Sequence, residues 1–134
     1  MRNVSKALEL VPLILSQPKT TAVSLVMALS TQTIALAWGR AKRAEGLAQG
    51  RLKGEYFDFL KQSGSVFTGR PWGSAAGAWA EAAEHWRAQS IDNALDALLD
   101  ADIALKQTGF SSEEQVMATL VLAMCIADER SMAA

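Results

Sequence analysis

The chain contains few of the residues that covalent chemistry and metal binding require. Its 134 residues include one cysteine, Cys125, and one histidine, His85. A single cysteine excludes an intramolecular disulfide and fits a reducing, cytoplasmic setting. A single histidine leaves little material for a histidine-rich metal site or for a serine–histidine–aspartate triad. The composition therefore favours a protein without a metal or other cofactor, and it does not favour an enzyme.

The chain also lacks an excess of charge of either sign. It has 13 basic and 14 acidic residues, a net charge of −1, so no overall positive field attracts nucleic acid. Five basic residues between Arg40 and Lys53 allow a local nucleic-acid interpretation, but a solvated helix end is favoured because no aromatic side chains are interleaved with them. Gly46, Gly50 and Gly54, in the same region, match no phosphate-binding loop pattern.

Helical periodicity dominates the rest of the sequence. Half of the residues are hydrophobic and a fifth are charged, which is typical of a globular domain of this length. Apolar residues recur at helical spacing, and no segment is a credible strand. The sequence predicts an all-α fold, a single bundle of five to six helices over residues 1–134. The expected helices span about 5–16, 18–44, 55–62, 74–88, 90–109 and 111–127, and the tail 128–134 is expected to fray.

The apolar run 20–39 is the one uncharged segment long enough to span a bilayer. Its centre is polar, with Ser30, Thr31, Gln32 and Thr33 in succession. We therefore predict a buried central helix, entered at Pro18 as its first residue, and not a membrane span.

The segment from Ser90 to Gly109 is the most informative helix. Ser90 is a suitable N-cap and Gly109 a suitable stop. At about 100° per residue, the large apolar residues fall on one arc, which contains Ile91, Leu95, Leu98, Leu99 and Leu105. A strip of small residues beside this arc would let another helix approach closely; its members are Ala94, Ala97, Ala101 and Ala104. The next helix has a capping box, Ser111 with Glu114.

Asp102 lies near the centre of the leucine arc, one turn before Lys106. A carboxylate on the core side needs a partner, because burying it unpaired costs several kcal/mol. Lys106 or backbone N–H groups of a neighbouring helix would supply one. A general acid or base is the less favoured alternative, since no second titratable group converges on the site. We expect a structural acid on the core side, with Asp102→Ala costing roughly 1–3 kcal/mol.

Two tryptophans, Trp79 and Trp86, are seven residues apart and share a helix face. At this spacing they are more often core or interface anchors than parts of a cofactor site. Together with Trp38 they leave a second hypothesis open, in which the chain is a stand-alone helical ligand-binding or protein-interaction domain with a Trp-lined pocket.

The runs ALDALLDADIALKQTG and EEQVMATLVLAMC resemble the end of the delta subunit of bacterial DNA polymerase III, a clamp-loader component. In that family a leucine-rich helix carries an aspartate and then a Leu-Lys pair, and a Gly-containing loop leads to a final leucine-rich helix. The matching positions are Leu95, Leu98, Leu99, Asp102, Leu105, Lys106, Leu120, Leu122 and Cys125.

The resemblance implies an all-helical collar domain, part of a longer subunit whose ATPase-like module is absent here. Such a domain supports DNA replication within the polymerase holoenzyme but is itself non-catalytic. Its implied partners are the collar domains of the delta-prime and gamma/tau subunits, and it would reach DNA only through the assembled loader, without a membrane or a small-molecule substrate. The candidate structural and interface residues are Asp102, Lys106, Leu98, Leu105, Ala94, Ala97, Ala101, Trp79, Trp86 and Leu120.

Overall fold

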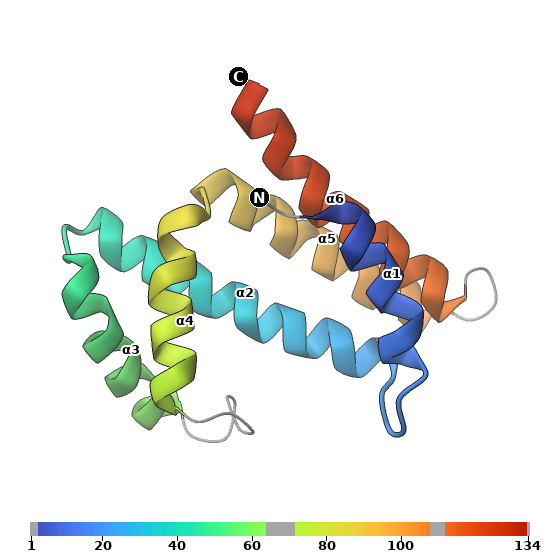
Figure 1. Ribbon diagram of the computed structural model, residues 1–134, viewed down its shortest axis with the longest axis horizontal. Helices are drawn as coiled ribbons and strands as arrows, with labels where there is room; N and C mark the ends of the chain where they lie inside the picture. The colour runs from blue at the N-terminus through green and yellow to red at the C-terminus, as the bar shows by residue number, and fades with distance from the viewer. Residues whose placement is uncertain (1–2, 64–71, 108–111, 134) are drawn as a thin grey trace. The chain divides into compact units, whose positions relative to one another are not determined.

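The computed structural model describes residues 3–63, 72–107 and 112–133, and these residues form helices and short turns without a strand (Figure 1). The predicted all-α fold of five to six helices is confirmed, with six helices in the described residues. In chain order the helices are α1 (Val4–Leu15), α2 (Ala22–Ala44), α3 (Gln49–Ser63), α4 (Trp72–His85), α5 (Ala88–Lys106) and α6 (Glu113–Ala133).

The start of α2 differs from the prediction. Pro18 lies in the turn before the helix, and α2 begins at Ala22. Thr21 and Ser24 cap the helix reciprocally: the Thr21 N–H donates to Ser24 Oγ at 3.0 Å, and the Ser24 N–H donates to Thr21 Oγ1 at 3.1 Å. The two hydroxyls satisfy backbone donors that would otherwise lack partners at the first turn, and they set the boundary in place of the proline.

Two further helix starts were misplaced by the sequence analysis. Helix α3 begins at Gln49, so Gly50 and Gly54 are helical residues and not part of a flexible stretch. Helix α5 begins at Ala88, and Ser90 is a fully buried residue inside it rather than its N-cap. The predicted stop at Gly109 lies outside the described residues.

The last helix is also shifted at both ends. Its capping box is formed by Ser112 and Gln115, with the Gln115 N–H donating to Ser112 Oγ at 3.1 Å and the Ser112 N–H donating to Gln115 Oε1 at 3.3 Å. The box lies one residue after the predicted pair of Ser111 and Glu114. Helix α6 then continues to Ala133, since no proline or glycine occurs after Ala127 to stop it.

By backbone contacts the chain divides into two compact units. We call residues 1–30 and 92–134 the N/C unit, and residues 31–91 the central unit. Helix α2 contributes its first turns to the N/C unit and the remainder to the central unit. By length and composition α2 is the one helix among the described residues that could cross a membrane, and 33% of its most apolar window is buried.

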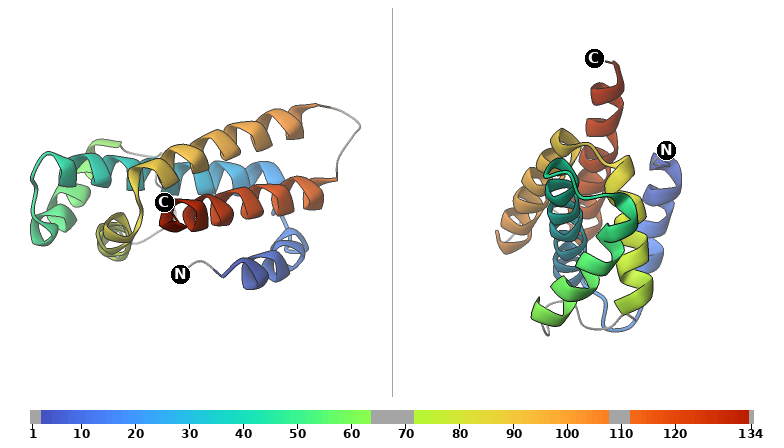
Figure 2. Two further views of the ribbon diagram at one scale, coloured as in Figure 1. Left: turned by 90° about the horizontal axis from the view of Figure 1, so that it is seen from above. Right: turned by 90° about the vertical axis from the view of Figure 1, so that its left-hand side faces the viewer.

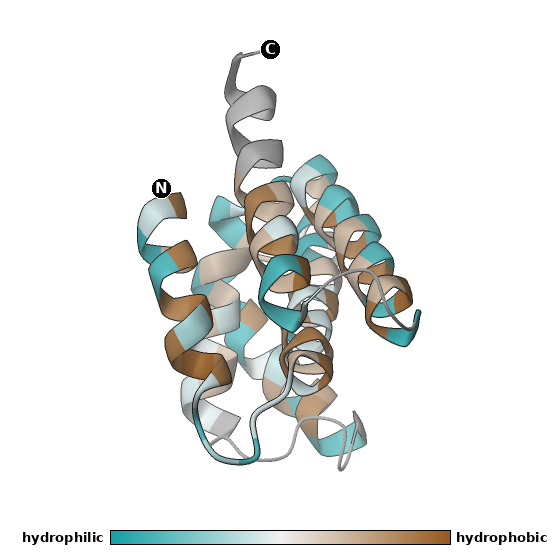
Figure 3. Ribbon diagram, turned by 90° about the vertical axis from the view of Figure 1, so that its right-hand side faces the viewer, coloured by the Kyte–Doolittle hydropathy of each residue, from teal (hydrophilic) through white to brown (hydrophobic). Residues whose placement is uncertain are grey.

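The N/C unit contains α1, the first turns of α2, most of α5, and α6. Helix α1 packs against α6, and α5 and α6 run side by side in opposite directions (Figure 2). Apolar residues form bands along these helices (Figure 3). Their buried members form one core cluster, which contains Val11, Ala22, Val26, Leu98, Ala101, Val116, Met117 and Leu120. Near one end of this core, the Ala22 N–H donates to Glu113 Oε2 at 3.5 Å.

The core of the central unit is organised around Tyr56 on α3, which is fully buried. Its ring centroid lies 4.9 Å from that of Trp38 on α2 and 5.5 Å from that of Trp79 on α4. Its hydroxyl donates a 2.6 Å hydrogen bond to the carbonyl of Ala35 on α2. The rest of this cluster is mostly leucine and alanine and contains Leu52, Leu60, Ala75, Ala76, Ala80 and Ala83. This one aromatic side chain on α3 therefore contacts both α2 and α4.

Gly39 makes room for Tyr56 on α2. A Cβ built at Gly39 would overlap the Tyr56 hydroxyl and lie 2.7 Å from Tyr56 Cζ. Neither atom can move away easily, because the hydroxyl is hydrogen-bonded to the Ala35 carbonyl and the ring is packed between Trp38 and Trp79. The absence of a side chain at this position is a packing requirement.

We expect Gly39→Ala to lower the free energy of unfolding by about 1–3 kcal/mol, because overpacking a closed core outweighs the gain in helix propensity. Urea denaturation followed by circular dichroism measures this change. Gly73→Ala is the matched control, since a Cβ there meets nothing within 4 Å. We expect the control to be neutral or stabilising; an equally neutral Gly39→Ala would contradict the packing argument.

Burial raises the pKa of Tyr56 above its ordinary value, with a smaller opposing effect from a backbone hydrogen bond at Gly39. The folded chain therefore holds this proton at pH values where the unfolded chain loses it. Burial of the protonated Tyr56 therefore makes its full contribution to the free energy of unfolding below about pH 10, and this contribution is lost as pH rises further. Tyr56 is the only tyrosine, so its ultraviolet absorbance reports its ionisation directly. We expect phenolate absorbance near pH 10 only in urea; ionisation near pH 10 in the folded chain would show that Tyr56 is hydrated.

Candidate interaction surface

The buried side of α5 overlaps the predicted arc, with Ile91 and Leu98 buried, but is turned toward the alanine strip. Within the N/C unit its buried residues are Ala94, Leu98 and Ala101, spaced four and then three residues apart as expected for one helix face. Leu99 is 58% exposed and Ile103 is 45% exposed. The alanine strip thus lies on the core side, while part of the leucine arc is at the surface. Small residues on this side let the neighbouring helices approach closely. The prediction placed the largest apolar residues in the core and therefore did not give the alanines this role.

Asp102 is not in the core, contrary to the prediction. Its side chain is 37% exposed and lies 2.6 Å from Lys106 Nζ. The partner at i+4 is therefore the expected one, but the ion pair lies at the surface and Lys106 is 71% exposed. Pairs of this kind contribute little, because water screens the charges and two long side chains lose freedom.

We expect Asp102→Ala to change the free energy of unfolding by about 0–0.5 kcal/mol, less than the 1–3 kcal/mol expected for a core acid. Asp96→Ala, at an exposed position of the same helix, should give a similarly small change. Chemical denaturation of the two variants in parallel measures both. A loss of several kcal/mol at Asp102 alone would indicate a buried partner and contradict the surface placement.

A groove of about 290 Å³ lies between α5 and α6 on the surface of the N/C unit. Small side chains leave it unfilled, with Ala97 and Ala104 on α5 and Thr119 and Ala123 on α6. Its remaining lining residues are Asp100, Ala101, Gln115, Val116 and Leu120. Ala101, Val116 and Leu120 are buried, so the groove leads to the core and has polar groups among an otherwise apolar lining. An apolar helix face could be seated in such a groove.

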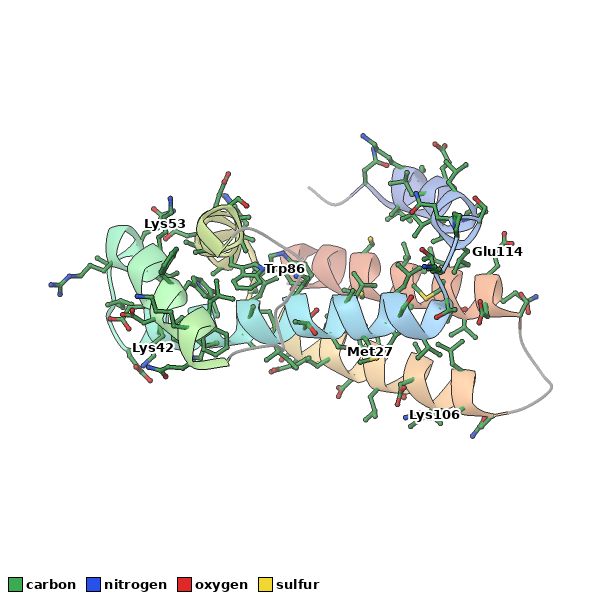
Figure 4. The ribbon with its side chains drawn as sticks, turned by 90° about the horizontal axis from the view of Figure 1, so that it is seen from below. Met27, Lys42, Lys53, Trp86, Lys106 and Glu114 are labelled. Carbon is green, nitrogen blue, oxygen red and sulfur yellow. The ribbon has the colours of Figure 1, made fainter. Side chains whose placement is uncertain are left out.

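Exposed large apolar side chains are found on the helices of the same unit. They occur on α1, α2, α5 and α6 and comprise Leu10, Leu13, Val23, Met27, Leu99, Ile103 and Leu122. Met27, labelled on α2 in Figure 4, is 66% exposed. Exposed apolar side chains that gather on neighbouring helices are typical of protein–protein contact surfaces. The groove is the candidate interaction surface, and these exposed residues, which do not line it, are further apolar positions of the same unit.

The predicted site residues divide between the two units. Leu98, Ala101 and Leu120 meet in the core of the N/C unit, and Ala97 and Leu105 are partly buried against it. Ala94 is buried on the same side of α5. Trp79 belongs instead to the core of the central unit, where its indole N–H donates to Gln32 Oε1 at 2.5 Å. Trp86 is partly buried.

Two of the three tryptophans expected around a pocket, Trp38 and Trp79, pack against the Tyr56 ring. Trp38 stacks on Phe59 with ring centroids 4.8 Å apart, and both Trp38 and Trp79 contact the Tyr56 ring. Tyr56 lies between them: Trp79 is buried in the core of the central unit, and Trp38 is partly buried against that core. Trp86 is outside that buried cluster.

The basic residues at the end of α2 are partly neutralised. Arg43 Nη2 lies 2.7 Å from Glu84 Oε1, and Lys42 Nζ lies 3.3 Å from Glu45 Oε2. Figure 4 shows Lys42 and Lys53 on different sides of the central unit. This arrangement agrees with a solvated helix end rather than one continuous phosphate-binding surface. Among the described residues, no group of three His, Cys, Asp or Glu side chains is placed to hold a metal ion.

Sequence reasoning missed Tyr56 and Gly39, the pair that fixes the central unit. Available signals were that Tyr56 is the only tyrosine and that Gly39 interrupts a long helical pattern, because a glycine inside a helix often marks close packing.

Comparison of the chain with family models, with curated proteins and with solved structures gives no match. Function therefore has to be argued from the surface itself.

Proposed function

We propose that this chain is a non-catalytic assembly module, the collar domain of a delta-type subunit of a bacterial DNA polymerase III clamp loader. In this proposal it associates with the collar domains of the delta-prime and gamma/tau subunits in the cytoplasm. It supports DNA replication by holding the loader together and contacts DNA only through the assembled loader.

The α5–α6 groove is the observation that carries the proposal. The resemblance to the delta family is best from Trp86 to Cys125, and this segment supplies the whole lining of that groove. Leu99 and Leu122, two of the leucines in the resemblance, are exposed, although burial of either side chain would contribute about 1.5–3 kcal/mol. An unfilled groove between α5 and α6, together with an exposed leucine on each of these helices, supports burial against partner helices.

The alternative function, ligand binding in a Trp-lined pocket, has less support. Trp38 and Trp79 contact Tyr56 in the core of the central unit. A ligand binding between them would have to displace the packed Tyr56 ring, which costs several kcal/mol. Among the described residues an enzymatic role has less support, because Asp102, the acid considered for catalysis, is paired with Lys106 at the surface.

We expect Ala97→Trp to weaken assembly at least tenfold while changing the free energy of unfolding by less than about 1 kcal/mol. The indole would fill the groove that the partner helix needs, at a position that is only partly buried. Co-purification with cognate delta-prime and gamma/tau collar domains measures assembly. Ala28→Trp is the control, since Ala28 is exposed on α2 and outside the groove.

Two results would contradict the proposed function. One is failure of the unmodified chain to associate under conditions where the complete subunit assembles. The other is ATP turnover by the chain alone, measured as phosphate release, because the proposal assigns no chemistry to it. Equal loss of assembly in the Ala97→Trp and Ala28→Trp variants would keep the module but exclude the groove as its contact surface.

A further inference from the structure

The outer face of α3 contains two glycines that the fold does not require. Gly50 and Gly54 are one turn apart, and a Cβ built at either meets nothing within 4 Å. A glycine in a helix interior, such as Gly54, costs about 1 kcal/mol relative to alanine, whereas Gly50 lies in the first turn of α3. Within the described residues nothing lies close enough to explain this cost, in contrast to Gly39, where Tyr56 does.

The glycines lie on the opposite side of α3 from its core residues. Leu52, Tyr56 and Leu60 are buried, and at about 100° per residue Gly50 and Gly54 point away from them. A shallow depression follows this outer face, lined by Gly50, Arg51, Gly54, Glu55, Phe57 and Asp58. Phe57 is 36% exposed, and Lys61 lies over its ring with Nζ 5.4 Å from the centroid. The face combines a flat centre, an accessible aromatic ring and charges of both signs.

Two of the three charged residues that line this depression, Arg51 and Asp58, are arranged so that a second copy complements them. Arg51 precedes Gly54 by three residues, and Asp58 follows it by four, which is about 4.5 Å and 6 Å along the helix axis. An antiparallel α3 from another copy, crossing near Gly54, would bring each Arg51 beside the partner copy's Asp58. Arg51 has no ion-pair partner among the described residues, and Asp58 has a long contact of 4.0 Å with Lys61.

We propose that two copies of this chain associate through their α3 helices, antiparallel and two-fold symmetric about Gly54. The glycines let the helix axes approach closer than the usual distance of about 8–10 Å, and two Arg51–Asp58 pairs fix the direction. A two-fold contact buries the same face on both copies, so self-complementary charge favours a second copy over an unrelated partner. The contact uses α3 and not the α5–α6 groove, so its test does not depend on whether the proposed function is correct.

Sedimentation velocity of the complete chain over a concentration series tests the association. One helix pair is a small interface, so we expect a reversible dimer at about 100 µM and monomer at about 1 µM. Gly54→Leu should abolish the dimer by keeping the helices apart. Gly73→Leu, the same change at another glycine with open space, should leave the dimer intact. A monomer at all concentrations would overturn the proposal, as would a dimer that survives Gly54→Leu.

A charge exchange tests the pairing without changing the glycines. Arg51→Glu and Asp58→Arg should each produce monomers, because each variant opposes like charges across the two-fold axis. An equimolar mixture of the two variants should associate again, and so should the double variant. Residues 51 and 58 are about 10.5 Å apart along one helix, so rescue cannot come from pairing within a chain. Circular dichroism verifies that each variant is folded, and absence of rescue in folded variants would overturn the antiparallel arrangement.

Discussion

The burial of Tyr56 is the constraint on which the central unit depends. A phenol ring fills the space between three helices, and its hydroxyl must then find an acceptor, because an unpaired buried hydroxyl costs about 1–3 kcal/mol. The Ala35 carbonyl supplies that acceptor at 2.6 Å, and Gly39 supplies the space one turn further along α2. Trp38 on α2 and Trp79 on α4 pack against the Tyr56 ring. The alanines of α4 allow α3 to pack against it at close range.

The N/C unit is held together by many small contacts instead of one large side chain. Its core combines alanine on α2 and α5 with valine, leucine and methionine on α1, α2, α5 and α6. Alanines bring helices together but leave gaps where two of them face each other, and the α5–α6 groove is such a gap. The same residues therefore serve the core and the proposed contact with a partner helix. Leu99 and Ile103 lie outside this core and are available to a partner.

Small residues have three different roles in this chain. Gly39 is enclosed by a packed tyrosine, the alanines of α5 border a groove, and Gly50 and Gly54 face open space. A sequence pattern treats all of them as permissive positions. Only the surrounding atoms distinguish a packing requirement from a surface to which another helix can bind, because the energetic effect of a missing side chain depends on what would contact it.

The sequence alone determined that this protein is helical. The 3.6-residue periodicity, the absence of alternating strands and the helix formers in six segments all depend on local interactions that extend over a few residues. The i+4 pairing of Asp102 with Lys106 was predictable for the same reason. Tertiary structure decided the rest: which face of α5 is buried, that Asp102 is at the surface, and that Ser90 is inside a helix and not at its cap. These outcomes depend on which helices pack together and how closely their small residues let them approach, and residues distant in sequence supply those contacts.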